Sequence, residues 1–258
     1  MDASLRVAYL ARLGMDRAPE ATLAGLTALV VRHLAAVPFE NYDIFRRVPV
    51  VLDTERAVEK VALHRRGGFC FEVNEAFRAL LVSLGFVVKR IEGRVWIARV
   101  GRFGAPFDHL ALVVSLPEGA FLVDVGFGDN NRVPMRLPED TVQDISGTYH
   151  LGPDPGAPGF WVLTRRASPA GAAPVQPLYR MTLAPRALGD FSEMCRYHQT
   201  APESLFMRGL VCTLPTQDGR LTMTADRLIQ MKDGVRSERR LRTEEARLAT
   251  LRDTFGVV

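Results

Sequence analysis

The sequence predicts an α+β protein, with helices first, strands in the middle and a mixture of both at the C-terminal end. Up to about residue 85, apolar residues recur at helical spacing, as at Leu5, Tyr9 and Leu13. From Phe86 onward the pattern changes to β-rich runs that glycine and proline separate. After Pro185 the chain mixes a short helix, several strands and a closing charged helix.

Four helices are expected in the first third, because each apolar run has a local start or stop signal. Capping side chains favour helix starts, whereas proline and glycine favour helix ends. The signals are, in chain order, Gly14 at the end of the first helix, Thr22 and Pro38 around the second, Asp53 and Gly67 around the third, and Cys70 and Gly85 around the fourth.

The later elements are expected from β-rich runs and turn signals. Strands are predicted at 86–100, 109–116, 121–125, 161–164 and 178–183, with loops at 152–159 and 167–177. The last part is predicted to contain a helix at 188–197, strands around Val211, Leu221 and Val235, and a final helix at 243–254.

The composition indicates a folded protein with a sizeable core, since 47% of the 258 residues are hydrophobic and 24% are charged. No apolar run approaches the ~18 residues of a membrane span, and the N-terminus lacks an apolar secretory segment. The net charge of +4 is mild and the basic residues form no stripe, so neither a membrane nor a nucleic-acid partner is predicted. Three cysteines do not suggest a disulfide framework, and we expect a cytoplasmic protein.

The sharpest chemical feature is a cysteine that follows two glycines and starts a predicted helix. Gly67 and Gly68 let the backbone approach closely, and Cys70 then lies at the helix N-terminus. Unpaired N–H groups there favour a thiolate over a thiol, which suits a nucleophile. The alternative is a buried structural cysteine, because free cysteine often behaves as a small apolar residue.

A thiolate nucleophile needs a base, and His109 is the best placed of the five histidines. It opens the apolar strand 110–114, and sites are commonly assembled at strand ends. A structural histidine at the rim of the sheet is the alternative. His33 and His64 are expected on or near helices, at the surface or the edge of the core, and His150 in an exposed loop. His198 follows Cys195 at a Cys-x-x-His spacing, but without the second ligand pair that zinc requires.

Asp124 is the carboxylate expected to orient His109, because a charge inside an apolar strand is costly unless it is paired. Alternatively, the Asp124 carboxylate bonds to N–H groups of the following turn. Asp108 is a poorer candidate to orient His109, because residues 108 and 109 are neighbours on a strand and face opposite sides. With a hairpin turn centred on Glu118-Gly119, Asp124 faces Val113, about 13 Å along the strand from His109 at ~3.3 Å per residue. A bulge or a shifted turn is therefore needed to bring the two together.

At these residues the chain resembles the arylamine N-acetyltransferase family, because several motifs of that family occur in the same order. The most specific is Arg66-Gly67-Gly68-Phe69-Cys70-Phe71-Glu72, followed by Asn74, which resembles the nucleophile signature of the family. The other matching segments are 9–14, 38–41, 109–110, 123–128 and 198–200, the last with Pro202, Ser204 and Phe206.

The resemblance implies a fold with three domains on a core similar to that of transglutaminases and papain. These are a helical domain at 1–85 with the nucleophile, a β-barrel at 86–187 with the histidine and aspartate, and an α/β lid at 188–258. The resemblance further implies that Cys70, His109 and Asp124 form a catalytic triad.

The same resemblance implies ping-pong transfer of acetyl from acetyl-CoA, through a cysteine thioester, to an arylamine, arylhydrazine or N-hydroxyarylamine. No tightly bound cofactor and no metal are expected. Phe39 and Phe127 would line the acceptor pocket, and Gly126 and Gly128 would lie near the acyl or CoA end.

Other functions stay open at this point. A cysteine peptidase or a transglutaminase-like enzyme would use the same triad with water or a lysine as acceptor, and some relatives of the family are amide synthases that close a polyketide chain. A non-catalytic protein that binds CoA or another small molecule would need no working triad. Acetylation of Cys70 by acetyl-CoA separates a transferase from the peptidase and from the binding protein.

Overall fold

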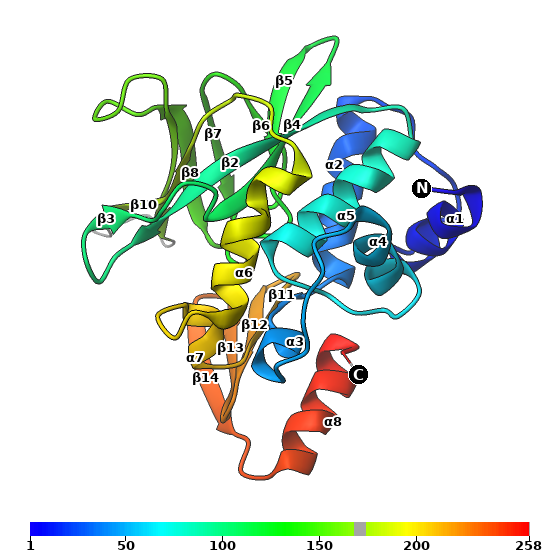
Figure 1. The fold of residues 1–258 in the computed structure, drawn as a ribbon, viewed down its shortest axis with the longest axis vertical. Coiled ribbons are helices and arrows are strands. Elements are labelled where there is room, and N and C mark those ends of the chain that lie inside the picture. The colour runs from blue at the N-terminus through cyan, green and yellow to red at the C-terminus, as the bar shows by residue number, and fades with distance from the viewer. Residues whose placement is uncertain (168–173, 258) are drawn as a thin grey trace.

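The computed structural model describes residues 1–167 and 174–257, and it confirms the predicted α+β class (Figure 1). The N-terminal helices pack beside a curved sheet, and a smaller sheet with the C-terminal helix lies at the opposite end (Figure 1). The loop expected at 167–177 falls mostly on 168–173, which lie outside the described residues. Ala167 ends one strand and Val175 begins the next.

Three of the five N-terminal helices begin at a side chain that accepts a hydrogen bond from a free N–H group of the first turn. Thr22 Oγ1 accepts from the Gly25 N–H at 3.2 Å, and Asp53 Oδ1 accepts from the Arg56 N–H at 2.9 Å, as the sequence predicts. Gly85, with a φ of +90°, follows the last of these helices and ends it. The helices of this part are α1 (Ala3–Arg12), α2 (Leu23–Ala36), α3 (Tyr42–Phe45), α4 (Thr54–Ala62) and α5 (Cys70–Ser83).

A strongly curved antiparallel sheet forms the middle of the chain, and its two edge strands, β6 and β7, come into contact. Its order is β6-β5-β4-β2-β10-β9-β8-β7, with β3 paired to β2, so the sheet nearly closes into the expected barrel. The sequence does not predict β7 and β8, and β8 takes in part of the loop expected at 152–159. The strands are β2 (Val87–Ile97), β3 (Arg102–Phe103), β4 (His109–Leu116), β5 (Gly119–Val123), β6 (Met135–Arg136), β7 (Asp140–Asp144), β8 (Gly147–Pro153), β9 (Trp161–Ala167) and β10 (Val175–Met181).

The hairpin of β4 and β5 corrects the register expected from the sequence. Leu116 pairs with Gly119, so the turn consists of residues 117 and 118. The expected alignment of Asp124 with Val113 is therefore wrong by two residues. Continued past the end of β5, the observed register puts Asp124 only two positions from His109 and on the same face. The shifted turn, not a bulge, brings the two side chains together.

The C-terminal part contains a second antiparallel sheet, which reaches back to the beginning of the chain. β1 (Phe39–Glu40) forms one edge by pairing with β11, and the order is β1-β11-β12-β13-β14. A 3-10 turn and α6 precede this sheet where one helix is predicted at 188–197, and α8 packs against it. The elements are η1 (Leu188–Phe191), α6 (Ser192–Thr200), α7 (Leu205–Arg208), β11 (Val211–Thr216), β12 (Gly219–Thr224), β13 (Arg227–Lys232), β14 (Val235–Arg240) and α8 (Glu244–Phe255).

Three clusters of buried side chains form the core, and they cross the predicted domain boundaries. The first packs α1, α2, α4 and α5 against β4 and β5, and it also takes in Phe191 and Cys195. The second fills the curved sheet around Tyr179. The third lies between the smaller sheet and α8, where Tyr42 joins it from α3. The division into 1–85, 86–187 and 188–258 therefore stays a prediction.

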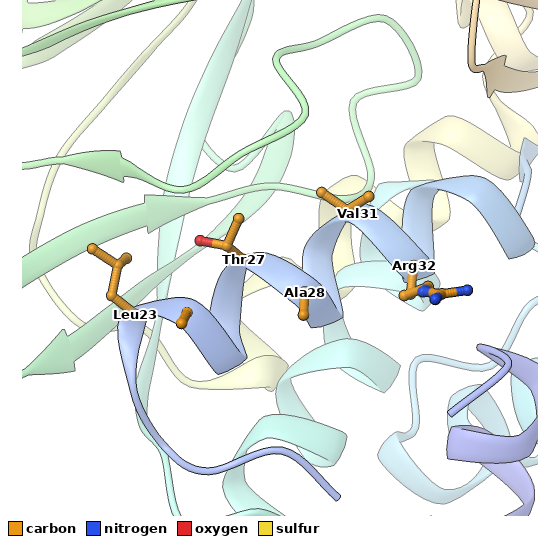
Figure 2. Close-up of a pocket in the computed structure, with 6 residues that line it drawn as sticks. Leu23, Thr27, Ala28, Val31 and Arg32 are labelled. Atoms are coloured by element: carbon orange, nitrogen blue, oxygen red, sulfur yellow. The ribbon is translucent and has the colours of Figure 1, made fainter. Parts of the chain in front are cut away.

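One exposed face of α2 carries a shallow, open hollow (Figure 2). All of its lining residues belong to this helix, and none of them is a predicted site residue. We therefore place the candidate site elsewhere, at the start of α5. The hollow is lined by Leu23, Ala24, Thr27, Ala28, Val31 and Arg32.

Candidate active site

Cys70 is the first residue of α5, a helix that is buried on nearly all sides. The two glycines before it make this placement possible. A Cβ atom on Gly67 would lie 1.9 Å from the Pro38 carbonyl oxygen, and one on Gly68 would lie 2.7 Å from Glu72 Oε2. The N–H groups of the first helical turn have no acceptor within the helix, so they place partial positive charge at Cys70.

A network of buried charges holds the start of α5. Glu72 Oε2 accepts from the Phe69 N–H at 3.2 Å, and Glu72 Oε1 lies 2.7 Å from Lys60 Nζ. Nearby, Arg66 Nη2 lies 2.8 Å from Glu40 Oε1. Burial raises the pKa of Glu72 to about 7, although Lys60 acts in the opposite direction. Only one local signal in the sequence points to this network, a glutamate three residues after the helix N-cap.

The imidazole of His109 and the carboxylate of Asp124 form a buried pair. His109 is the first residue of β4, and Asp124 directly follows β5. His109 Nε2 lies 2.7 Å from Asp124 Oδ2, and both residues are buried. The structure therefore brings together the histidine and the aspartate that the sequence singles out.

The Asp124 carboxylate also accepts hydrogen bonds from the turn that follows it and from α5. Its Oδ1 accepts from the Gly126 N–H and from the Asn74 side-chain N–H, each at 2.9 Å. The two roles considered for Asp124, pairing with His109 and bonding to the turn, are thus carried by different oxygens of one carboxylate. Burial favours the neutral acid, but the His109 charge and these hydrogen bonds lower the pKa of Asp124 below its ordinary value.

The Cys70 thiol lies beside the same imidazole ring. Because Nε2 is engaged with Asp124, Nδ1 is the ring nitrogen that remains for Cys70. Burial lowers the pKa of His109, but the Asp124 charge, the hydrogen bond to Asp124 and the neighbouring Cys70 raise it to about 10. The ring is therefore protonated at neutral pH and can pair with an anion on either side.

The four residues that the resemblance links to substrates lie around this group. Gly126 packs closely on α5, since a Cβ atom there would lie 3.0 Å from Cys70 Cα. The Phe127 ring stands edge-on to the His109 ring, with 5.5 Å between their centroids. A Cβ atom on Gly128 would lie 3.3 Å from Phe39 Cδ1. One aromatic ring thus contacts His109, and another borders the glycine-containing loop 126–128.

Two histidines differ from the sequence expectation. His33 is fully buried rather than at the surface or the core edge, and its Nδ1 lies 3.1 Å from the Tyr9 hydroxyl. Its spacing from Leu26 and Leu29 on α2 is the signal that could have found it. His150 is exposed as expected, but it lies in β8 and not in a loop.

Asp108 does not orient His109. Its carboxylate accepts from the Val95 N–H at 3.2 Å, and it lies 3.4 Å from His198 Nε2. This arrangement agrees with the expectation that neighbouring strand residues face opposite sides. The contact with His198 has no local signal in the sequence, because 90 residues separate the two.

The remaining cysteines are buried free thiols. Burial raises the pKa of Cys195 to about 12 and that of Cys212 well above its ordinary value. In residues 1–167 and 174–257, no three His, Cys, Asp or Glu side chains are grouped so that they could hold a metal ion. Over the same ranges, no helix is long and apolar enough to cross a membrane.

Comparison with known proteins establishes the family. A family model described as N-acetyltransferase matches residues 22–258. Over 96% of its length the chain is 34% identical to an arylamine N-acetyltransferase of Mycolicibacterium smegmatis, of which 90% is covered. The chain belongs to the arylamine N-acetyltransferase family.

Solved structures of arylamine N-acetyltransferases have the same fold. One from Salmonella typhimurium matches with a TM-score of 0.90 and 27% identity, and the match covers 100% of this chain and 92% of that one. The Mycobacterium marinum arylamine N-acetyltransferase, solved in complex with CoA, matches with a TM-score of 0.87 and 32% identity over 97% and 92% of the two chains. The helical part, the nearly closed sheet and the C-terminal α/β part together form the fold of this family.

Proposed function

We propose that this member of the arylamine N-acetyltransferase family carries acetyl from acetyl-CoA, through a thioester on Cys70, to an arylamine, arylhydrazine or N-hydroxyarylamine. The buried 2.7 Å contact between His109 Nε2 and Asp124 Oδ2, with Cys70 beside the same ring, is the observation that carries the proposal. The CoA complex of the Mycobacterium marinum relative supports acetyl-CoA as the donor.

In the first half-reaction, the Cys70 thiolate attacks the acetyl carbonyl carbon of acetyl-CoA while the His109 imidazolium lies beside it. The free N–H groups at the start of α5 stabilise the negative oxygen of the tetrahedral intermediate. The bond between the acetyl carbon and the CoA sulfur then breaks. CoA takes the proton of His109 as it leaves, and Cys70 carries the acetyl group as a thioester.

In the second half-reaction, the amine nitrogen of the acceptor attacks this thioester. Neutral His109 takes the proton that the nitrogen loses, and Cys70 leaves as a thiolate. Asp124 stabilises the imidazolium that exists at the beginning and end of the cycle. An aromatic amine is weakly basic and mostly unprotonated at neutral pH, so its lone pair is available for the attack.

Two aromatic side chains and two glycines are proposed to shape the binding site. Phe127 contacts the His109 ring and Phe39 borders Gly128, so flat apolar walls lie next to the reacting group. Gly126 and Gly128 would lie near the acyl group and the end of CoA, because the missing Cβ atom at 126 lets this loop lie directly against α5 at Cys70. Such walls favour an aromatic acceptor over an aliphatic one.

We also propose that the reaction takes place in the cytoplasm. All three cysteines are free thiols, which suits a reducing compartment. Cell fractionation followed by an activity assay for arylamine acetylation checks this. Activity confined to a membrane or secreted fraction contradicts it.

Intact-mass measurement after incubation with acetyl-CoA tests the function. We expect one added acetyl group, located on Cys70 by peptide mapping, and its loss when an arylamine is then supplied. The Cys70→Ala variant is the control and should remain folded, take up no acetyl group and release no CoA. An unmodified wild-type protein would contradict the transferase mechanism and favour a peptidase or a binding protein.

A further inference from the structure

Asn74 lies one helical turn after Cys70 and is fully buried within α5. Its side-chain nitrogen donates to the Leu110 carbonyl at 2.7 Å and to Asp124 Oδ1 at 2.9 Å. Its side-chain oxygen accepts from the Val125 N–H at 3.0 Å. Both N–H groups of the amide and its oxygen therefore have partners.

These partners settle which way the amide points. The nitrogen faces two acceptors, a carbonyl and a carboxylate, while the oxygen faces a donor. A flipped amide would set an oxygen against Leu110 O and Asp124 Oδ1 and an N–H against the Val125 N–H. Only the observed orientation satisfies all three contacts, so Asn74 acts as a fixed connector.

The three contacts join the segments that carry the proposed triad. Asn74 belongs to the helix that begins with Cys70, Leu110 directly follows His109 in β4, and Val125 directly follows Asp124. A shift of any one segment against the other two would break at least one of these buried hydrogen bonds. A buried polar group that loses its partner is costly, so the amide resists such shifts.

We propose that Asn74 is a positioning residue for acetyl transfer, which holds Asp124 against His109 and both against Cys70. This inference rests on the proposed function. Asn74 donates to Asp124 Oδ1, as does the Gly126 N–H, while Oδ2 lies against His109 Nε2 and accepts a longer hydrogen bond of 3.4 Å from Asn130 Nδ2. It therefore acts on the reaction through Asp124 and the backbone, and it does not need to touch the substrate.

Gly126 makes this arrangement possible. A Cβ atom at position 126 would lie 2.5 Å from Asn74 Nδ2, so any side chain there would push the amide away. The position of the Asn74 amide therefore depends on the absence of a Cβ atom at residue 126.

The chain contains a matched control for testing this role. Asn41 is also buried; its nitrogen donates to two carbonyls, Phe206 O and Gly209 O, at 2.8 Å each, and its oxygen accepts from the Val211 N–H at 2.7 Å. It makes the same pattern of hydrogen bonds as Asn74, but none of its partners belongs to the triad segments. Asn41→Ala therefore measures what the loss of such a connector does to folding alone.

The experiment compares Asn74→Ala and Asn41→Ala in melting temperature, in kcat and KM for acetyl-CoA, and in the rate of Cys70 alkylation by iodoacetamide. We expect Asn74→Ala, per folded molecule, to lose about 10²-fold in kcat with a smaller change in KM, because a misplacement of the reacting groups by about 1 Å costs that much in rate. We also expect Cys70 of this variant to be alkylated more slowly. Asn41→Ala should keep its kcat within about threefold. Equal kcat losses per folded molecule in the two variants, or none in Asn74→Ala, would overturn the proposal.

A second variant covers the case in which Asn74→Ala does not fold. Asn74→Asp keeps the size of the side chain and its acceptor for the Val125 N–H, but at alkaline pH it turns a carboxylate toward Asp124. At pH 9 we expect a kcat at least tenfold below that of the wild type at the same pH, and a ratio within twofold overturns the proposal. If the wild type itself forms no acetyl-Cys70, the proposed function fails, and the role of Asn74 fails with it.

Discussion

The carboxylate of Asp124 binds the imidazole of His109 with one oxygen and leaves the other for the turn that follows. The two roles can therefore be separated by a single substitution. In Asp124→Asn the amide oxygen can still accept from the Gly126 N–H and from Asn74. The amide NH₂ then points at His109 Nε2, where an acceptor is needed.

We expect Asp124→Asn to stay folded and to lose about 10⁴-fold in turnover of acetyl-CoA, by analogy with the serine-protease triad. The physical reason is that the imidazole loses both the partner that fixes its orientation and the charge that raises its pKa. Turnover and melting temperature measured on the same preparation check this. Near-normal turnover in a folded Asp124→Asn protein would remove Asp124 from the triad.

Asp108→Asn is the control for that experiment. Asp108 precedes His109 directly, but its carboxylate contacts the Val95 N–H and His198 instead. An amide oxygen can still accept from Val95, so we expect turnover within about threefold of the wild type. A large loss in Asp108→Asn, with little effect of Asp124→Asn, would reverse the assignment of the two aspartates.

The helices could be predicted from the sequence because their signals are local. Thr22 and Asp53 each cap an N–H only three residues away. In contrast, β1 pairs Phe39 with Thr213, and no pattern near either residue reports a contact across that distance in sequence. The same holds for Asn74: its place one turn after Cys70 can be read from the sequence, whereas its contact with Leu110 cannot.

The hairpin register shows how a small local error affects a site. Glycine favours a turn, yet Gly119, with a φ of +137°, begins β5 and follows the turn. A turn expected one residue too late shifts every cross-strand pair by two. In the expected register His109 and Asp124 are about 13 Å apart along the strand, at ~3.3 Å per residue. In the structure their side chains are in contact.

Iodoacetamide at neutral pH should alkylate Cys70 well before Cys195 or Cys212. The protonated His109 ring and the start of α5 both place positive charge beside the Cys70 sulfur, whereas burial raises the pKa of the other two thiols. Peptide mapping at partial inactivation identifies the labelled residue. Earlier labelling of Cys195 or Cys212, or inactivation without labelling of Cys70, contradicts the assignment of the nucleophile.

Gly126→Ala should reduce turnover strongly and lower the free energy of unfolding by about 1–3 kcal/mol, the usual cost of overpacking. The added Cβ atom would lie 2.5 Å from Asn74 Nδ2 and 3.0 Å from Cys70 Cα, and neither the buried amide nor the helix backbone can move away freely. Gly189→Ala is the control, because no atom lies within 4 Å of its Cβ position. Denaturant unfolding and turnover are measured for both, and equal effects would argue against a close contact at Gly126.

The stability of the protein should fall as the pH rises from about 4.5 to 7, in part because of Glu72. Burial raises the pKa of this carboxyl from 4.5 to about 7, so between these values the folded protein holds a proton that the unfolded chain has lost. Stability then decreases as pH increases, and the stabilising contribution of Glu72 is complete below its pKa in the unfolded chain.

Glu72→Gln keeps an oxygen to accept from the Phe69 N–H but cannot titrate. Between pH 5 and pH 8, we expect the melting temperature of the wild type to decrease by more than that of Glu72→Gln. Parallel curves for the two proteins would show that Glu72 remains ionised throughout this range, held so by Lys60 at 2.7 Å.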